Sequence, residues 1–113
     1  MKISEMAQVL GWETLAMPAP DIEVTGGYTG DLLSWVMGRA KTGNVWVTIM
    51  TNRNILAVAT LAGVSAVVVT EHAEIDEETI HLAKEQEINL LRADAPSFET
   101  VYAVGKLLER QNQ

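Results

Sequence analysis

The fold class follows from residues 45–70, which read VWVTIMTNRNILAVATLAGVSAVVVT. The β-branched and aromatic run at 45–50 is typical of a strand, and the uncharged run at 65–70 is typical of a buried parallel strand. The segment between them predicts an apolar helix over about 55–62, entered through the polar loop 51–54. Two strands joined through a helix by short loops predict a right-handed βαβ unit.

The same alternation of strands and helices continues toward the C-terminus. Residues 71–74 form a polar loop, 76–86 predict a helix with an acidic first turn, and 88–91 predict a short strand. A second polar loop over 94–97 leads into a last helix that begins at Ser97. Five residues share one face of this helix at helical spacing: Phe98, Val101, Tyr102, Gly105 and Leu108.

The N-terminal part predicts further elements of the same kinds. We expect a helix over 3–10 and strands over 12–16 and 22–25. Asp31 or Thr29 then caps a helix that ends near Ala40. The elements together predict an α/β fold in one domain over 1–113, with a small, mainly parallel sheet of about five strands layered between flanking helices.

Composition excludes several classes of protein. The chain of 113 residues has no cysteine, which excludes disulfides, thiolate nucleophiles and cysteine-bound metals. Its net charge is −7 and its eight basic residues are scattered, so we expect no nucleic-acid partner. The uncharged run 55–69 is too short for a membrane span and is interrupted by Gly63 and Ser65, so we expect a cytoplasmic protein without a membrane partner.

Polar loops at the ends of three strands are the candidate binding site. Ligands of open α/β sheets bind beyond the carboxyl ends of the strands, and each of these loops leads into a helix N-terminus that favours an anion. A small anion such as a nucleotide is therefore the expected ligand class, although ordinary caps and turns would give the same loops. The candidate residues are Thr51, Asn52, Arg53, Thr70, His72, Ser97, Gly27 and Thr29.

The glycine-dense run 26–30 is compatible with close approach of a phosphate. It matches neither the dinucleotide-binding pattern nor the P-loop, and a tight turn from a strand to a helix explains the glycines equally well. His72 and His81 do not have the spacing of a metal-binding pair. We therefore expect no catalytic residues, no cofactor and no metal site.

Most of the chain, from about Val24 to Leu108, resembles the DRTGG domain family. The stretches that carry the resemblance are 27–34, 47–55 and 95–100, which read GYTGDLLS, VTIMTNRNI and APSFET. Arg53 matches the arginine of the family's name and Asn52 stands in place of its aspartate. Thr70 matches the threonine, and the two glycines that follow it are replaced by Glu71 and His72.

The resemblance implies an accessory module and not an enzyme. DRTGG domains occur alone or joined to phosphotransacetylases and CBS-domain pyrophosphatases, where they help to form dimers and relay regulation. They are similar in fold to the N-terminal, non-catalytic domain of HPr kinase/phosphorylase. The chain has no P-loop, so no kinase activity is inferred from that similarity.

Three hypotheses about function follow. The first is a non-catalytic, homodimeric regulatory domain that senses a nucleotide or another small anion. The second is an interaction or scaffold subunit without a small ligand, which Trp35 and the apolar helix at 55–62 favour because they suggest contacts beyond one small core. The third is a phosphate-ester enzyme that uses Arg53, His72 and either Asp94 or Glu71.

Overall fold

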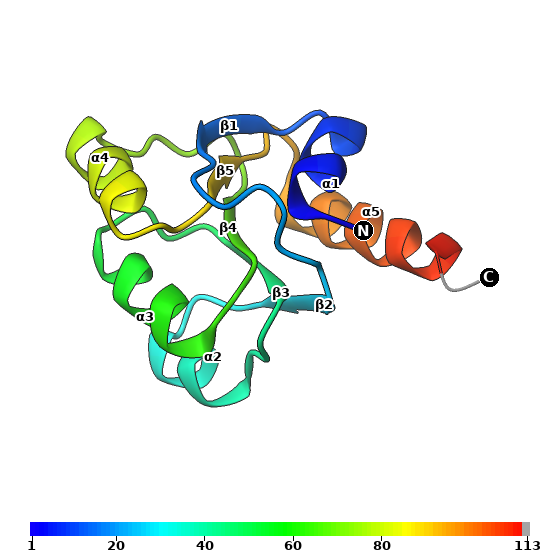
Figure 1. Ribbon diagram of the computed structural model, residues 1–113, viewed down its shortest axis with the longest axis horizontal. Coiled ribbons are helices and arrows are strands. Elements are labelled where there is room, and N and C mark those ends of the chain that lie inside the picture. The colour runs from blue at the N-terminus through cyan, green and yellow to red at the C-terminus, as the bar shows by residue number, and fades with distance from the viewer. Residues whose placement is uncertain (112–113) are drawn as a thin grey trace.

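The computed structural model describes residues 1–111 and shows a five-stranded sheet between two layers of helices (Figure 1). The strand order is β1-β5-β4-β3-β2, with β1 antiparallel to β5 and all other neighbours parallel. This arrangement confirms the predicted α/β class and the mainly parallel sheet. The strands are β1 (Glu13–Ala16), β2 (Gly26–Thr29), β3 (Asn44–Thr48), β4 (Ala66–Val69) and β5 (Leu90–Arg92).

Helices cover both faces of the sheet. Strands β2 to β5 follow one another across the sheet, so right-handed crossovers place the three connecting helices on the same face. These helices are α2 (Leu33–Arg39), α3 (Asn54–Ala62) and α4 (Glu77–Glu85). The opposite face is covered by α1 (Ile3–Leu10) and α5 (Ser97–Gln111) (Figure 1).

Each face of the sheet has its own hydrophobic core, because side chains alternate along a strand. In β4, Val67 and Val69 pack under α3 and α4, whereas Val68 packs under α1 and α5. Trp46 of the central strand β3 is fully buried on the α3 side, and its indole N–H donates to the Gly30 carbonyl at 2.9 Å. That hydrogen bond ties the end of β2 to the core.

The glycine-dense run is a strand, so its interpretation as a turn was wrong. Residues Gly26–Thr29 pair in register with β3 as β2, the edge of the sheet, and the strand expected over 22–25 is reduced to an isolated bridge between Lys2 and Glu23. The tight packing explains the first glycine of β2, because a Cβ on Gly26 would lie 3.3 Å from the side-chain nitrogen of Asn44. Propensity alone disfavours glycine in strands, and close approach of a neighbouring strand overrides it here.

Two predictions about helices also differ from the structure. Neither Asp31 nor Thr29 caps α2: the residue before this helix is Leu32, which makes no side-chain cap. Helix α3 is buried on one side through Ile55, Leu56 and three smaller residues, but Leu61 is 70% exposed. The apolar composition of α3 therefore overstated how far the helix is covered.

No helix within the described residues is both long and apolar enough to cross a bilayer.

Candidate functional site

The carboxyl ends of β4 and β5 bring two of the predicted binding residues together. Thr70 follows β4 and is fully buried, and its hydroxyl lies 2.6 Å from the hydroxyl of Ser97 at the start of α5. The amide of Thr70 donates to the carbonyl of Thr48, the last residue of β3, at 3.0 Å. The parallel order of β3, β4 and β5 thus gathers three polar residues at one end of the sheet.

The carboxylate of Glu71 is hydrogen-bonded to the N-terminus of α5. Its Oε2 atom accepts a hydrogen bond from the backbone N–H of Ser97 at 2.9 Å. Glu71 and His72 both adopt positive φ angles, 61° and 51°, in a turn closed by the Ala73 N–H donating to the Thr70 carbonyl. These two residues stand where the resemblance places glycines, and their backbone conformation is the one that glycine adopts most easily.

The carboxylate of Asp31 likewise accepts hydrogen bonds at the end of β3. Its Oδ1 atom accepts the hydroxyl of Thr48 at 2.7 Å and the backbone N–H of Ile49 at 3.0 Å. Since Thr48 is buried, the carboxylate satisfies a hydroxyl that has little access to water. The side chain expected to cap α2 therefore fixes the loop that follows the central strand.

The predicted cation Arg53 lies at the start of α3 and forms an ion pair with a residue of α4. Its Nη2 atom is 2.6 Å from Oε1 of Glu78, and both side chains are more than half exposed. Asn52 accepts the backbone N–H of Asn54 at 2.9 Å just before α3, whose N-cap residue Arg53 makes no side-chain cap. Thr51 is half-buried in the same loop.

Helix α4 begins with a carboxylate cap. Asp76 accepts the backbone N–H of Thr79 at 2.7 Å, and the hydrogen bonds from the side chain and the amide of Thr79 lower the pKa of Asp76 below its ordinary value. Desolvation raises this pKa in opposition, and the positive charge of Arg53 makes the smallest contribution, which lowers it.

Three backbone amides at the carboxyl ends of the strands and the helix starts beyond them thus have carboxylate partners within the chain. The backbone N–H groups of Ile49, Ser97 and Thr79 donate to the carboxylates of Asp31, Glu71 and Asp76, respectively. An anionic ligand at these positions has to displace a carboxylate of the chain itself. The residues named for a phosphate-ester enzyme do not all meet. His72 contacts Asp94 through Nδ1, whereas Arg53 forms an ion pair with Glu78.

Gly27 and Thr29 line a groove between the edge strand β2 and helix α5, where Thr29 shares one hollow with Ser97. Two adjoining hollows of about 190 and 390 Å³ form it. The apolar face of α5 forms one wall, with Phe98 80% exposed and Tyr102 63% exposed. We call this feature the β2–α5 groove; its lining is Gly27, Tyr28, Thr29, Val47, Ser97, Phe98, Val101, Tyr102, Val104, Gly105 and Leu108.

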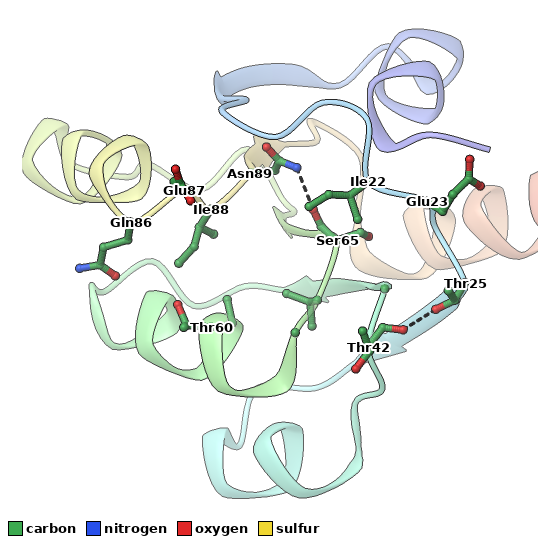
Figure 2. Close-up of a pocket in the computed structure, with 14 residues that line it drawn as sticks. Ile22, Glu23, Thr25, Thr42, Thr60, Ser65, Gln86, Glu87, Ile88 and Asn89 are labelled. Carbon is green, nitrogen blue, oxygen red and sulfur yellow. Dashed lines mark hydrogen bonds between the residues drawn. The ribbon is translucent and has the colours of Figure 1, made fainter.

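A larger cleft of about 430 Å³ lies at the opposite, amino ends of the strands (Figure 2). Its polar residues are bonded within the protein: Asn89 donates to the Ser65 carbonyl at 2.9 Å, and Thr25 donates to the Thr42 carbonyl at 2.7 Å. Sequence analysis missed this cleft, because its lining comes from turns and helix ends scattered between residues 22 and 89. Gly43 and Gly63 both have positive φ, so these glycines in the sequence indicate turns. They do not indicate that the turns border a cleft.

Comparison with known proteins gives a family match and a solved structure of similar fold. The model of the DRTGG domain matches residues 31–107, which is more than half of the chain. No curated protein matches.

A crystal structure of the CBS and DRTGG domains of the regulatory region of Clostridium perfringens pyrophosphatase, complexed with the activator diadenosine tetraphosphate, has a similar fold. The TM-score is 0.70 at 17% sequence identity over 90% of this chain. The matched part spans 44% of the solved chain, so the similarity covers less than half of that protein's length.

Proposed function

This chain belongs to the DRTGG domain family, and from that premise we propose that it is a regulatory domain that senses a ligand and does not catalyse a reaction. The observation that carries the proposal is the family match over residues 31–107. The fold shared with a regulatory region of a pyrophosphatase supports it. The proposed unit is a single domain over residues 1–113 that self-associates.

The proposed ligand class is a nucleotide. The solved regulatory region is complexed with diadenosine tetraphosphate, an anion with two adenosine groups. In this chain, the proposed anion contacts are the fully charged guanidinium of Arg53 and the hydroxyls of Thr70 and Ser97. The remaining predicted binding residues are Thr51, Asn52, His72, Gly27 and Thr29. Binding requires Arg53 to break its ion pair with Glu78. This pair is exposed, so it stabilises the fold only slightly.

The test is thermal melting of the purified protein with adenine nucleotides, guanine nucleotides, diadenosine tetraphosphate and inorganic phosphate. A ligand present at 100 times its dissociation constant adds about 2.7 kcal/mol, which raises Tm by roughly 10 °C for a domain of this size. Arg53→Ala is expected to abolish the shift. Arg110→Ala, which removes the same charge from the last turn of α5, is expected to retain it.

A melting temperature that no compound shifts contradicts nucleotide sensing. A shift that survives Arg53→Ala contradicts the assignment of the anion contact to the loop at the end of β3. Both outcomes leave self-association to be measured separately.

A second candidate function is that of an interaction module without a small ligand. It is favoured by the exposed apolar wall of the β2–α5 groove and by the carboxylates that occupy the loop amides. Under this function Arg53→Ala leaves the association with a protein partner unchanged, because Arg53 lies at the start of α3 and outside the groove.

A further inference from the structure

We propose that the β2–α5 groove binds the adenine base of a nucleotide whose phosphates reach the loops at the carboxyl ends of the strands. The proposal rests on the nucleotide-sensing function proposed above and names the part of the site that recognises the base. In this arrangement the base lies against Phe98 and Tyr102 of α5, and its amino group donates to the hydroxyl of Thr29 at the end of β2.

Two exposed aromatic rings provide the stacking surface. Phe98 is 80% exposed and Tyr102 is 63% exposed, and both line the same hollow. Residues four apart on a helix are neighbours on its surface, about 6 Å apart along the axis, so one planar base can contact both rings. Nucleobases stack on aromatic side chains of this kind. The wall of the groove therefore suits a flat aromatic ligand.

The hollow has the size of a ligand site. Its volume of about 390 Å³ falls within the range of about 300–1,000 Å³ that is usual for pockets that bind small molecules. The adjoining hollow of about 190 Å³ continues along β2, between Gly27 and Gly105. A Cβ on Gly105 would meet no atom within 4 Å, so α5 leaves this part of the groove open.

Thr29 gives the groove a preference for a base with an amino group. Its Oγ1 atom donates to the Val47 carbonyl at 3.0 Å. A hydroxyl has a single hydrogen, so Thr29 offers a ligand only its lone pairs. The exocyclic amino group of adenine supplies the missing donor. Adenine also has no carbonyl oxygen, so it needs fewer polar partners than guanine in a groove lined mainly by apolar side chains.

Ser97 connects the hollow to the proposed phosphate contacts. It lines the hollow together with Phe98 and is the first residue of α5. Its hydroxyl lies 2.6 Å from the hydroxyl of Thr70, at the carboxyl end of β4. The groove and the polar loops are therefore adjacent parts of one surface, and one nucleotide can contact both.

The distribution of charge favours the base as the occupant of the groove. The residues that line it include no aspartate, glutamate, lysine or arginine, although the chain carries a net charge of −7. At the loops, a phosphate has to displace the carboxylate of Glu71 from the Ser97 N–H. The uncharged base meets no such competitor, so we expect it to contribute a large share of the affinity.

The polar rim distinguishes a base from a purely apolar partner. An apolar side chain placed over Thr29 excludes water from its hydroxyl and leaves the lone pairs without a donor, which is unfavourable. A base covers the two rings and supplies that donor at the same time. The combination of stacking surface and acceptor therefore favours a base.

The test is isothermal titration calorimetry of the full chain with ATP. Tyr102→Ala and, separately, Phe98→Ala are expected to raise the dissociation constant roughly tenfold, because each removes one stacking ring. Tyr102→Phe retains the ring and is expected to keep the affinity of wild type. Leu61→Ala, which truncates an exposed apolar side chain on α3, is the matched control and is expected to change nothing.

A second titration tests the acceptor. Purine riboside 5′-triphosphate has the base, sugar and phosphates of ATP without the amino group, and it is expected to bind wild type roughly tenfold more weakly than ATP. Thr29→Val is expected to weaken ATP and to leave purine riboside 5′-triphosphate unchanged. An equal loss for both compounds in Thr29→Val would overturn the assignment of the amino group to Thr29.

Far-UV circular dichroism shows whether each variant is folded. ATP affinity that is unchanged in both folded alanine variants overturns the proposal and leaves nucleotide sensing at the loops intact. Alanine variants that change the sedimentation coefficient but not the ATP affinity assign the groove to a protein contact and overturn the proposal as well. A wild type that binds GTP but not ATP overturns adenine recognition alone, whereas a wild type that binds neither contradicts nucleotide sensing itself.

Discussion

Carboxylates of the chain itself occupy the backbone donors at the carboxyl ends of the strands. Asp31 accepts from Ile49 and from the buried hydroxyl of Thr48, and Glu71 accepts from Ser97 at the start of α5. Charge-assisted bonds of this kind are stronger than bonds between neutral groups. These hydrogen bonds hold the loops in one arrangement. An anionic ligand that binds the same N–H groups has to displace the carboxylates.

The turn after β4 gives a prediction at the scale of single residues. Glu71 and His72 both have positive φ, which costs an L-residue about 1 kcal/mol or more relative to glycine. His72→Gly removes that strain and loses an exposed contact with Asp94 of small value. It is therefore expected to raise the free energy of unfolding by about 1 kcal/mol, measured by urea denaturation.

Glu71→Gly is the matched comparison for this prediction. It removes the same strain but also the bond from the Ser97 N–H, which stabilises the start of α5. Its gain is expected to be smaller than that of His72→Gly. If His72→Gly destabilised the protein more than Glu71→Gly did, the argument from backbone strain would be wrong.

Among the helices, α5 shows how a single element divides its surface. Thr100 and Val104 are buried against the sheet, whereas Phe98 and Tyr102 are exposed at the β2 edge. Residues 103 and 107 lie toward α1, in a shallow hollow between the two helices. The apolar face that the sequence pattern marks on α5 is therefore a wall of the groove at Phe98 and Tyr102.

Helix α4 provides a prediction about pH. Hydrogen bonds from Thr79 hold the pKa of Asp76 below its ordinary value in the folded protein, so the charged carboxylate stabilises the folded state. A depressed pKa contributes stability that is fully present above the unfolded pKa and is lost as the pH falls through the folded value. The contribution of Asp76 is therefore expected to be constant near pH 7 and to disappear below about pH 4.

The measurement is urea denaturation of wild type and Asp76→Ala at several pH values. Asp76→Ala is expected to be less stable than wild type at pH 7, and the difference is expected to narrow as the pH falls below about 4. Asp76→Ser is the control, because a serine hydroxyl caps a helix without a charge near neutral pH. A difference that is the same at pH 7 and at pH 3 would show that the charge of Asp76 is not what stabilises α4.

At the scale of the whole molecule, one sheet separates two hydrophobic cores. Strand β4 contributes to both, since Val67 and Val69 face one core and Val68 faces the other. The central strands are buried on both faces, so disrupting one core also removes the support on which the other core packs. One cooperative unfolding transition is therefore expected for the whole chain.

Val67→Ala and Val68→Ala test this prediction on opposite faces of β4. Each removes two buried methyl groups and is expected to cost about 2 kcal/mol, which lowers Tm by roughly 8 °C. In a background that carries Trp12→Phe and Trp35→Phe, tryptophan fluorescence reports on Trp46 in the α3-side core, and far-UV circular dichroism reports on the whole chain. Transitions that separate between the two probes in either variant would contradict a single domain over residues 1–113.

The amino-acid sequence by itself determined the order of elements and the fold class. The β-branched runs of β3 and β4 act locally through side-chain alternation, and Asn52 and Asp76 act through hydrogen bonds to backbone groups within three residues. Local rules of this kind place helices and strands within a few residues, and short βαβ connections then permit essentially one handedness. The polar loops at the carboxyl ends follow from the same reasoning.

The tertiary structure alone decided which side chains meet and which faces stay open. Asp31 reaches Thr48, Glu71 reaches Ser97 and Arg53 reaches Glu78 across 17 to 26 residues of sequence. Strand order sets these pairs, and residue periodicity carries no information about it. Periodicity likewise marks α5 as apolar at Phe98 and Tyr102 but does not state what covers them, because burial depends on the elements that surround a face.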